Sequence, residues 1–433
     1  MPVKAHCSAL AAVLWKLYLC DQNCSACPLL GGGCAPNVTR SSLVLLGGFW
    51  FPSSVGRAKD KIEEKNLRSW KLLDDFRRRL AEVQAAAPKR AKRPGGPERK
   101  LLEEDYFSLM LFGLFNPVID SMRGLCAASH LKRVQQDVCS RPVSLGSFSE
   151  AQGVFEPELL KQVFLQLAEE IPTSWGDARL AHLADKLKLV DGTLLPALPR
   201  MHWALWLNDQ NRAAKLHLKF TVLRQAPSDA LITTANSCER KSLRQFMKKG
   251  ETIVGDRYYG LEYGFFRELR EMGVSHVIRI RNNPRMEIVE ELPLTEADRA
   301  AGVTWQGLVK LGDQWQGEPI RVVKIEVDGK SLLLATDLEI EAELIALIYR
   351  YRWQIELFFK WMKSILGNRH LMAESPEGVA IQTYSALIAA LMLQLLTGKR
   401  PGKRAMELIR FYLMGHAELD EVIALLGLEK ITK

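Results

Sequence analysis

Beyond about residue 175 the sequence changes from helix-length segments to short apolar segments, and this change limits the fold more than any other feature. Residues 187–191 are mostly apolar and stop at a glycine, whereas residues 216–223 and 275–281 alternate apolar and polar side chains. Both patterns are typical of β-strands. Helical patterns separate the later strands. The resulting order, β-β-β-α-β-α-β, predicts an α/β fold in which a mixed sheet is flanked by helices.

The segments that follow complete this organisation. A β-rich insertion occupies about residues 283–337, and two long helical patterns come after it. The expected strands are 187–191, 216–223, 230–234, 251–256 and 275–281, and the expected helices are 239–249, 261–272, 341–366 and 378–396.

The N-terminal part of the chain has a different composition. Residues 1–55 form a Cys-rich extension, and residues 56–100 form a charged helical segment followed by a basic linker with three prolines. The linker is either a solvated tether or a phosphate-binding arm. Residues 101–175 are helical in pattern, with Pro157 where a helix can begin. Residues 401–433 are expected to form a C-terminal helical segment.

The net charge limits the classes of partner. Lys and Arg number 59 and Asp and Glu number 50, so the net charge is +9. An excess of this size favours a polyanionic partner, most simply nucleic acid. Hydrophobic residues make up 47% and charged residues 25%, so most of the chain is expected to be neither disordered nor membrane-embedded. Polar side chains interrupt the most apolar stretch, residues 379–397, which we interpret as a buried helix.

The cysteines are concentrated near the N-terminus. Five of the eight lie within the first 34 residues, which does not resemble a disulfide framework, so a reducing, cytoplasmic setting is expected. Cys20, Cys24, Cys27 and Cys34 have the spacing of iron–sulfur or zinc ligands. A metal-binding module is therefore an alternative to the interpretation of residues 1–55 as an extension without a function.

Three acids are the candidate catalytic residues. Asp191 begins the tripeptide Asp-Gly-Thr, and Asp256 lies in Val-Gly-Asp-Arg-Tyr-Tyr, each at the end of an expected strand. Asp-Gly-Thr, taken alone, is also a common turn signal, and Asp256, taken alone, also has a purely structural interpretation. The third acid, Glu356, lies on the helix expected after the insertion.

That helix carries the most informative pattern. At about 100° per residue, Tyr349, Arg352 and Lys363 fall within about 40° of the line through Glu356. One helix face therefore carries a phenol, a guanidinium, a carboxylate and an ammonium group, while the other faces are apolar. The alternative is a surface helix on which Arg352 and Glu356 form an i,i+4 ion pair.

The spacing Tyr-x2-Arg-x3-Glu-x6-Lys resembles the YREK signature of bacterial insertion-sequence transposases with an Asp-Asp-Glu active site. Four residue types at fixed spacing make this a fairly specific signal. The positions that meet it are Tyr349, Arg352, Glu356 and Lys363.

The two earlier acids resemble the strand-end acids of the same group, in Asp-Gly-Thr at Asp191 and in Asp-Arg-x-Tyr at 256–259. Tyr258 departs from the pattern, because relatives usually have glycine there. The resemblance covers about residue 101 to the C-terminus. It implies a ribonuclease-H-like catalytic domain at 176–400, with the β-rich insertion before the glutamate helix.

An enzyme of this group cleaves DNA at the ends of a mobile element and joins those ends to target DNA. The resemblance implies that Asp191, Asp256 and Glu356 hold two Mg2+ or Mn2+ ions in each active site, with Asp191 bridging both. Hard divalent ions prefer oxygen ligands, and three converging acids without a cation would repel one another.

The resemblance also implies partners. Tyr349, Arg352 and Lys363 would grip the cleaved DNA end, and Arg257 either contacts DNA or pairs with an acid. The DNA is double-stranded and comprises terminal inverted repeats and target DNA, and a homodimer or larger assembly is expected to bind it. Residues 101–175 are the expected DNA-end-binding domain. The protein is expected in the cytoplasm, associated with the nucleoid and not with a membrane.

Four further side chains have more than one interpretation. Trp305 and Trp315 in the insertion provide either a stacking surface for an extracted base or part of the core. His217 is interpreted as structural. His370, which follows the glutamate helix, is a further candidate for the site.

Two other classes of protein share these features. A non-catalytic DNA-binding descendant of a transposase would keep the basic surfaces and lose a metal ligand, whereas all three acids are present here. A nuclease of the same fold would cut DNA without joining it. The signature on the glutamate helix favours a transposase.

Overall fold

The computed structural model describes most of the chain from residue 71 onward. The chain divides into two units, Met1–Ser53 and Ser54–Lys433, and every described residue belongs to the second. The Cys-rich extension, the linker after Ala87 and His370 lie outside the described residues. The described ranges are 71–87, 101–116, 118–173, 176–198, 200–206, 211–365, 371–398, 400, 402–413 and 416–426.

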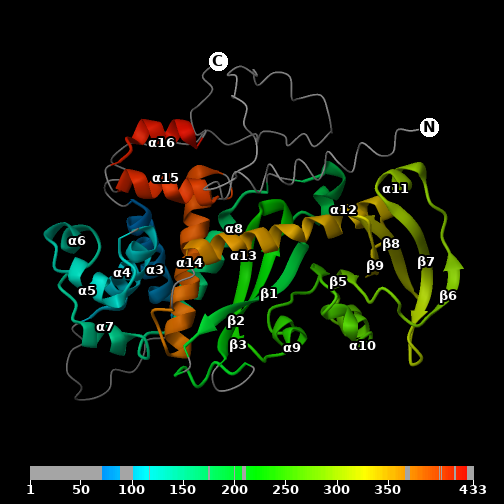
Figure 1. Cartoon of the computed structure of the whole chain (residues 1–433), viewed down its shortest axis with the longest axis horizontal. Coiled ribbons are helices and arrows are strands. Elements are labelled where there is room, and N and C mark those ends of the chain that lie inside the picture. The colour runs from blue at the N-terminus through cyan, green and yellow to red at the C-terminus, as the bar shows by residue number, and fades with distance from the viewer. Residues whose placement is uncertain are drawn as a thin grey trace, which may run out of the picture. The chain divides into compact units, whose positions relative to one another are not determined.

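A mixed sheet forms the centre of the described part of the chain. Its nine strands have the order β3-β2-β1-β4-β5-β9-β8-β7-β6 (Figure 1). Strand β1 pairs antiparallel with β2 and parallel with β4, and β4 pairs parallel with β5. The first five strands therefore have the ribonuclease-H-like arrangement that was predicted. They are β1 Leu187–Ala197, β2 Arg212–Thr221, β3 Ala226–Thr234, β4 Thr252–Gly255 and β5 Ser275–Arg279.

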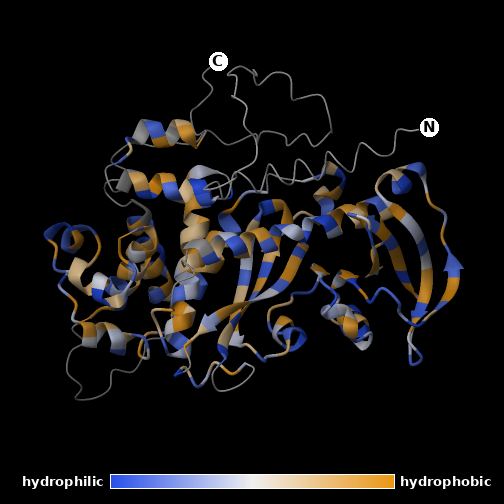
Figure 2. Cartoon of the chain, in the orientation of Figure 1, coloured by the Kyte–Doolittle hydropathy of each residue, from blue (hydrophilic) through white to orange (hydrophobic). Residues whose placement is uncertain are grey.

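The β-rich insertion extends this sheet. Strand β9 pairs antiparallel with β5, and β8, β7 and β6 follow outward (Figure 1). The insertion also contains a short helix, α11, which was not predicted and which Thr295 and Asp298 cap reciprocally. The outermost strand, β6, mixes hydrophobic and hydrophilic residues (Figure 2); it carries three glutamates, and charge on an edge strand opposes pairing with another sheet. The elements are β6 Met286–Glu291, α11 Glu296–Ala300, β7 Val303–Leu311, β8 Ile320–Val327 and β9 Lys330–Thr336.

Apolar side chains alternate between the two faces of the sheet. In β1, Leu189 belongs to the larger core cluster and Val190 to the smaller one, and in β4 the same holds for Val254 and Ile253. Because successive side chains of a strand point to opposite faces, the two clusters are two helical layers on either side of the sheet. The larger cluster includes α8 Pro157–Glu170, α12 Ala342–Tyr351, α13 Trp353–Ile365 and α14 Pro376–Thr397, and the smaller includes α9 Glu239–Leu243 and α10 Gly264–Glu271.

The helices that precede the sheet share the larger cluster. Helix α14 packs against α4 and α8, so it joins this helical region to the sheet. Pro157 is the first residue of α8, as predicted. The earlier helices are α3 Lys71–Ala86, α4 Glu103–Phe115, α5 Met122–Ala128, α6 Lys132–Asp137 and α7 Leu145–Ala151.

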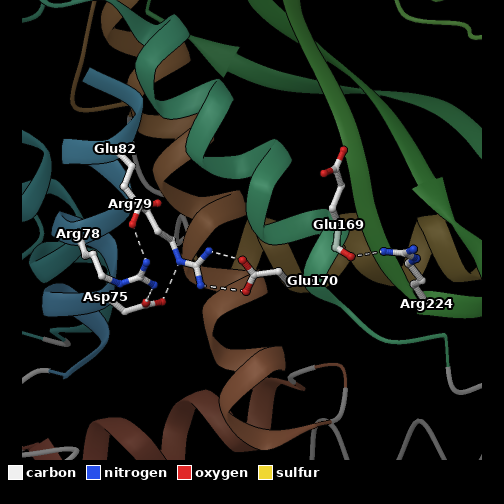
Figure 3. Close-up of polar contacts among 7 residues, drawn as sticks. All are labelled: Asp75, Arg78, Arg79, Glu82, Glu169, Glu170 and Arg224. Atoms are coloured by element: carbon white, nitrogen blue, oxygen red, sulfur yellow. Dashed lines mark hydrogen bonds and ion pairs between the residues drawn. The ribbon is translucent and has the colours of Figure 1, made fainter. Parts of the chain in front are cut away.

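Two arginines, the buried Arg79 and the half-buried Arg224, hold α8 on two sides (Figure 3). Arg79 of α3 donates to both carboxylate oxygens of Glu170 and pairs with Asp75 one turn earlier in α3. From the other side, Arg224 donates to the carbonyl oxygen of Glu169 at 2.6 Å. The last carbonyls of a helix have no partner within the helix, so Arg224 satisfies one of them.

Helix α14 is the described helix that is long and apolar enough to cross a membrane by length and composition. However, 89% of the most apolar 18-residue stretch of this helix is buried inside the protein. The interpretation of residues 379–397 as a buried helix is therefore confirmed. Two further helices follow it, α15 Lys403–Leu413 and α16 Leu419–Leu425.

Two element boundaries differ from the prediction more than the others do. Strand β1 does not end at Gly192 but continues to Ala197, because β2 pairs with it along this whole length. The helix expected at 239–249 ends at Leu243, after which the N–H groups of Gln245 and Phe246 bond to carbonyls three residues back and form turns.

Candidate active site

Asp191 and Asp256 lie at matching positions on neighbouring parallel strands. In the pairing of β1 with β4, Leu189 is opposite Val254. Asp191 and Asp256 each follow two residues later, and adjacent strands are about 4.8 Å apart. Residues two apart on a strand point to the same face, so Asp191 points, like Leu189, to the face that α13 covers. The structure thus brings two of the predicted acids to the same level of the sheet.

The carboxylate of Asp191 is mostly buried. Its Oδ1 accepts the N–H of Gly192 at 2.8 Å, and Nη1 of Arg352 lies 4.0 Å from its Oδ2. Burial raises the pKa of Asp191 to about 7, and the negative charge of Asp256 adds to the rise, which Arg352 opposes only in part. Because negative charge is disfavoured here, a bound cation would stabilise the ionised form of Asp191.

The turn after β4 orients Asp256. Its Oδ1 accepts the N–H of Tyr258 at 2.9 Å. The backbone of Tyr258 has φ −63° and ψ −39°, which any residue adopts, so this position has no requirement for the glycine of the family pattern. Tyr259 is buried beside Gly255, where a Cβ atom would lie only 3.0 Å from its Cδ2.

The third acid lies close to a break between two helices. The single helix expected at 341–366 is α12 followed by α13, with Arg352 between them. The N–H of Arg352 bonds to the carbonyl of Tyr349, and the N–H of Ile355 bonds to the carbonyl of Arg352. These bonds span three residues and tighten the chain into a 3-10 turn, while the two helices still follow one another across the sheet (Figure 1).

The predicted helix face is preserved through this turn. Nη2 of Arg352 lies 2.5 Å from Oε1 of Glu356, and its guanidinium carbon lies 5.8 Å from the centre of the Tyr349 ring. Burial raises the pKa of Tyr349. The i,i+4 ion pair of the alternative interpretation is therefore present. The same guanidinium also approaches Asp191, so it links the helix to the strand that carries the first acid.

Two predicted DNA contacts have no polar partner within the described ranges. Lys363 is half-buried two turns beyond Glu356, and burial lowers the pKa of its ammonium group. Arg257 is exposed beside Asp256 and pairs with no described acid. Both positive charges remain available to a ligand from outside the described chain.

Three other predicted side chains take part in packing. Trp305 and Trp315 are half-buried against the smaller cluster, and their indole N–H groups donate at 3.2 and 3.1 Å, respectively. His217 is buried on β2, where its Nε2 lies 2.8 Å from the hydroxyl oxygen of Thr233. These contacts support the packing interpretation of all three.

The sequence analysis missed two residues next to the site. Glu239 and Arg240 begin α9, in the layer on the other face of the sheet, and both contact the turn that carries Asp256. No periodicity or spacing in the sequence relates them to that turn, because the contact depends on how β3 leads into α9.

The acids present fit a hard divalent ion by their chemistry. Carboxylate oxygens are the ligands that Mg2+ prefers, and Asp191 and Asp256 repel each other without a cation. As the side chains stand, the described ranges hold no group of three or more His, Cys, Asp and Glu residues close enough to share one ion. Glu356 is turned toward Arg352. Asp191 and Asp256 are therefore the pair whose surroundings most favour a cation.

A family comparison matches this part of the chain. Residues 183–392 match the family described as the transposase DDE domain. The matched range contains Asp191, Asp256 and Glu356, as well as the whole sheet. Fold and match together define the class as proteins with an Asp-Asp-Glu transposase domain. Curated relatives that this chain resembles carry transposase names, two of them for insertion sequence elements.

Those relatives come from several bacteria. A Sinorhizobium fredii (strain NBRC 101917 / NGR234) protein, provisionally named transposase y4zB, is 28% identical over 232 residues, which cover 52% of this chain and 64% of that protein. A provisionally named transposase for insertion sequence element IS4SA, from Synechocystis sp. (strain ATCC 27184 / PCC 6803 / Kazusa), is 24% identical, and the match covers 62% of this chain and 77% of the relative. The chain thus spans less than two thirds of the Sinorhizobium protein.

A solved structure also aligns with this chain. The cryo-EM structure of the piggyBac transposase synaptic complex with hairpin DNA has a TM-score of 0.40 and 10% sequence identity, with 85% of each chain covered. The fold of the present chain is assigned from its own strand order.

Proposed function

We propose that this chain cuts DNA at the ends of a mobile element and transfers those ends into target DNA, in a reaction that needs divalent metal ions. The observation that carries the proposal is the matched placement of Asp191 and Asp256 beyond the paired residues Leu189 and Val254. Glu356 lies on a helix over the same face of the sheet and shares Arg352 with Asp191.

Asp191, Asp256 and Glu356 would hold the metal ions, two Mg2+ or Mn2+ in each site. Bound ions of this kind activate a water or hydroxyl and stabilise charge on the phosphate. Asp191 must lose a proton to act as a ligand, and its raised pKa means that proton and cation compete for it near neutral pH. Glu356 must turn away from Arg352 to take part.

The DNA contacts would come from the same helix face. In the DNA-free protein Arg352 neutralises part of the charge of two acids, and its guanidinium can bind a phosphate with two hydrogen bonds. Lys363 and Arg257 would add positive charge on either side of the acids, and Tyr349 would donate to a phosphate oxygen.

The wider partners follow from the same proposal. The DNA is double-stranded, as terminal inverted repeats and target DNA, and a homodimer or larger assembly would bring two ends together. Residues 101–175 would bind the element end, where Arg123, Lys132 and Arg133 are exposed on α5 and α6. The protein would act in the cytoplasm, on the nucleoid.

A plasmid assay tests the proposal. The plasmid carries the DNA that flanks the gene, and the products are analysed by gel after incubation of the full chain with Mg2+ or Mn2+. Cleavage at the element ends and joining to a second plasmid, both abolished by a chelator, are expected. Cleavage without joining would indicate a nuclease, and binding without cleavage would indicate a non-catalytic descendant.

A further inference from the structure

Two neighbouring residues at the start of α9 lie behind the proposed site. They belong to the helical layer on the face of the sheet opposite α13. Arg240 is 7% exposed, and the side chain of Glu239 is 16% exposed. Their polar groups are directed to residues 256–262, the segment that begins with Asp256.

Arg240 contacts this segment in three ways. Its Nη1 donates to the carbonyl oxygen of Tyr258 at 2.8 Å, and its Nη2 pairs with Glu262. Its guanidinium carbon lies 5.1 Å from the centre of the Tyr258 ring. The planar guanidinium group provides both the paired donors and the stacking face, which a lysine ammonium cannot.

Glu239 connects the same segment to β1 and β2. Its negative charge acts on the buried hydroxyl of Tyr259, and its carboxylate lies 3.4 Å from Nζ of Lys215 on β2. It also lies against β1 at Gly192, where a Cβ atom would be 3.0 Å from Oε1 of Glu239. Gly192 directly follows Asp191, so this one carboxylate contacts both the strand of the first acid and the turn of the second.

We infer that Glu239 and Arg240 are positioning residues that fix the Asp256 turn against the Asp191 strand and so keep the two carboxylates ready for a cation. The effect on metal binding and catalysis rests on the proposed function, whereas the effect on the conformation of the turn does not. Residues that orient metal ligands from behind change metal affinity or activity by about 10- to 100-fold when they are altered.

Three variants change one contact each with little change in volume. Arg240→Lys keeps the charge and loses the planar donors, Tyr259→Phe keeps the buried ring and loses the hydroxyl, and Glu239→Gln loses the charge that pairs with Lys215. Lys241→Ala is the matched control, because Lys241 is the next residue on α9 and its side chain is exposed.

The first measurement is amide hydrogen exchange of the full chain, which reports the turn without requiring activity. Faster exchange in residues 256–262 is expected for Arg240→Lys and Tyr259→Phe, while exchange in β1 and the melting temperature stay close to those of the Lys241→Ala control. Exchange in this segment that matches the control would overturn the inference, whether or not the protein cleaves DNA.

The second measurement is Mn2+ affinity, from the electron paramagnetic resonance signal of free Mn2+. Binding about 10-fold weaker than in Lys241→Ala is expected for each of the three variants, with DNA affinity unchanged. Mn2+ affinity within about twofold of the control in all three would overturn the inference. Failure of the unaltered chain to bind Mn2+ would instead contradict the proposed function, and the exchange measurement would then decide on the positioning alone.

Discussion

Arg352 and Glu356 form an ion pair one helical turn apart, with Nη2 and Oε1 separated by 2.5 Å. The guanidinium also lies 4.0 Å from Asp191, on a strand far away in the sequence. One cation thus serves two acids that belong to different layers of the fold. In the proposed enzyme this arrangement keeps the site compact until metal ions and DNA phosphates replace the internal contacts.

Each positive charge on this helix face should contribute separately to the salt dependence of DNA binding. Each of Lys363→Ala and Arg352→Ala should weaken binding to terminal-repeat DNA and reduce the slope of log K against log salt by about one unit. Fluorescence anisotropy over a salt series measures this slope. Lys330→Ala is the control, because Lys330 is exposed at the start of β9. Unchanged slopes in both variants would show that these residues are only solvated helix charges.

His217 should make the fold sensitive to acid. Burial, with a smaller effect from Lys215, lowers the pKa of His217 to about 4. The unfolded chain takes up this proton near pH 6.5, so the stability that neutral His217 contributes is complete above about pH 6.5 and is lost as the pH falls toward about 4. The free energy of unfolding should therefore fall between about pH 6.5 and about pH 4, and we expect His217→Gln to make this fall smaller by about 2 to 3 kcal/mol.

Urea unfolding across this pH range measures the effect, with the exposed His182→Gln as control. Loss of the contact with Thr233 should lower the stability of His217→Gln equally at every pH. The test is therefore the slope of the free energy of unfolding against pH, and not the free energy at any one pH. The same pH dependence in His217→Gln and in the unaltered protein would contradict the assignment.

The N-terminal segments should differ in their importance for folding. A chain that begins at Gly56 should fold and cleave like the full chain, because residues 1–55 lie outside the family resemblance. Removal of residues 1–87 should prevent folding or cost several kcal/mol, because α3 buries Leu73, Phe76 and Leu80, each worth about 1.5 to 3 kcal/mol. Thermal melting and nicking of both variants provide the measurement. Loss of folding in the shorter deletion would contradict the expectation for residues 1–55.

Much of the sheet could be predicted because its strands alternate. In β2 the side chains of Leu216 and Leu218 face the larger core, and those of Lys215 and His217, which alternate with them in sequence, lie on the other face. The end of β1 could not be predicted, because Asp-Gly-Thr is a common turn signal. It is part of a strand here because β2 provides antiparallel partners for it, from Leu218 back to Arg212.

The site was predictable only where its residues share one helix. Helical periodicity placed Arg352 beside Glu356, and the structure has them in contact. The approach of Arg352 to Asp191, and the position of Glu239 behind Gly192, join segments that are distant in the sequence. Such contacts depend on strand order and register, which local patterns do not specify.

Glu356→Gln tests the central claim most directly, by single-turnover nicking at a terminal repeat in Mg2+. The change is nearly isosteric, and if Glu356 only pairs with Arg352 it should cost roughly 0 to 1 kcal/mol and leave nicking intact. We predict instead a protein that melts normally and binds DNA but nicks it about a thousandfold more slowly or worse. Asp191→Asn and Asp256→Asn should behave alike, and combined changes should add little because the acids act as one unit. Near-normal nicking by folded Glu356→Gln would contradict the assignment of all three acids.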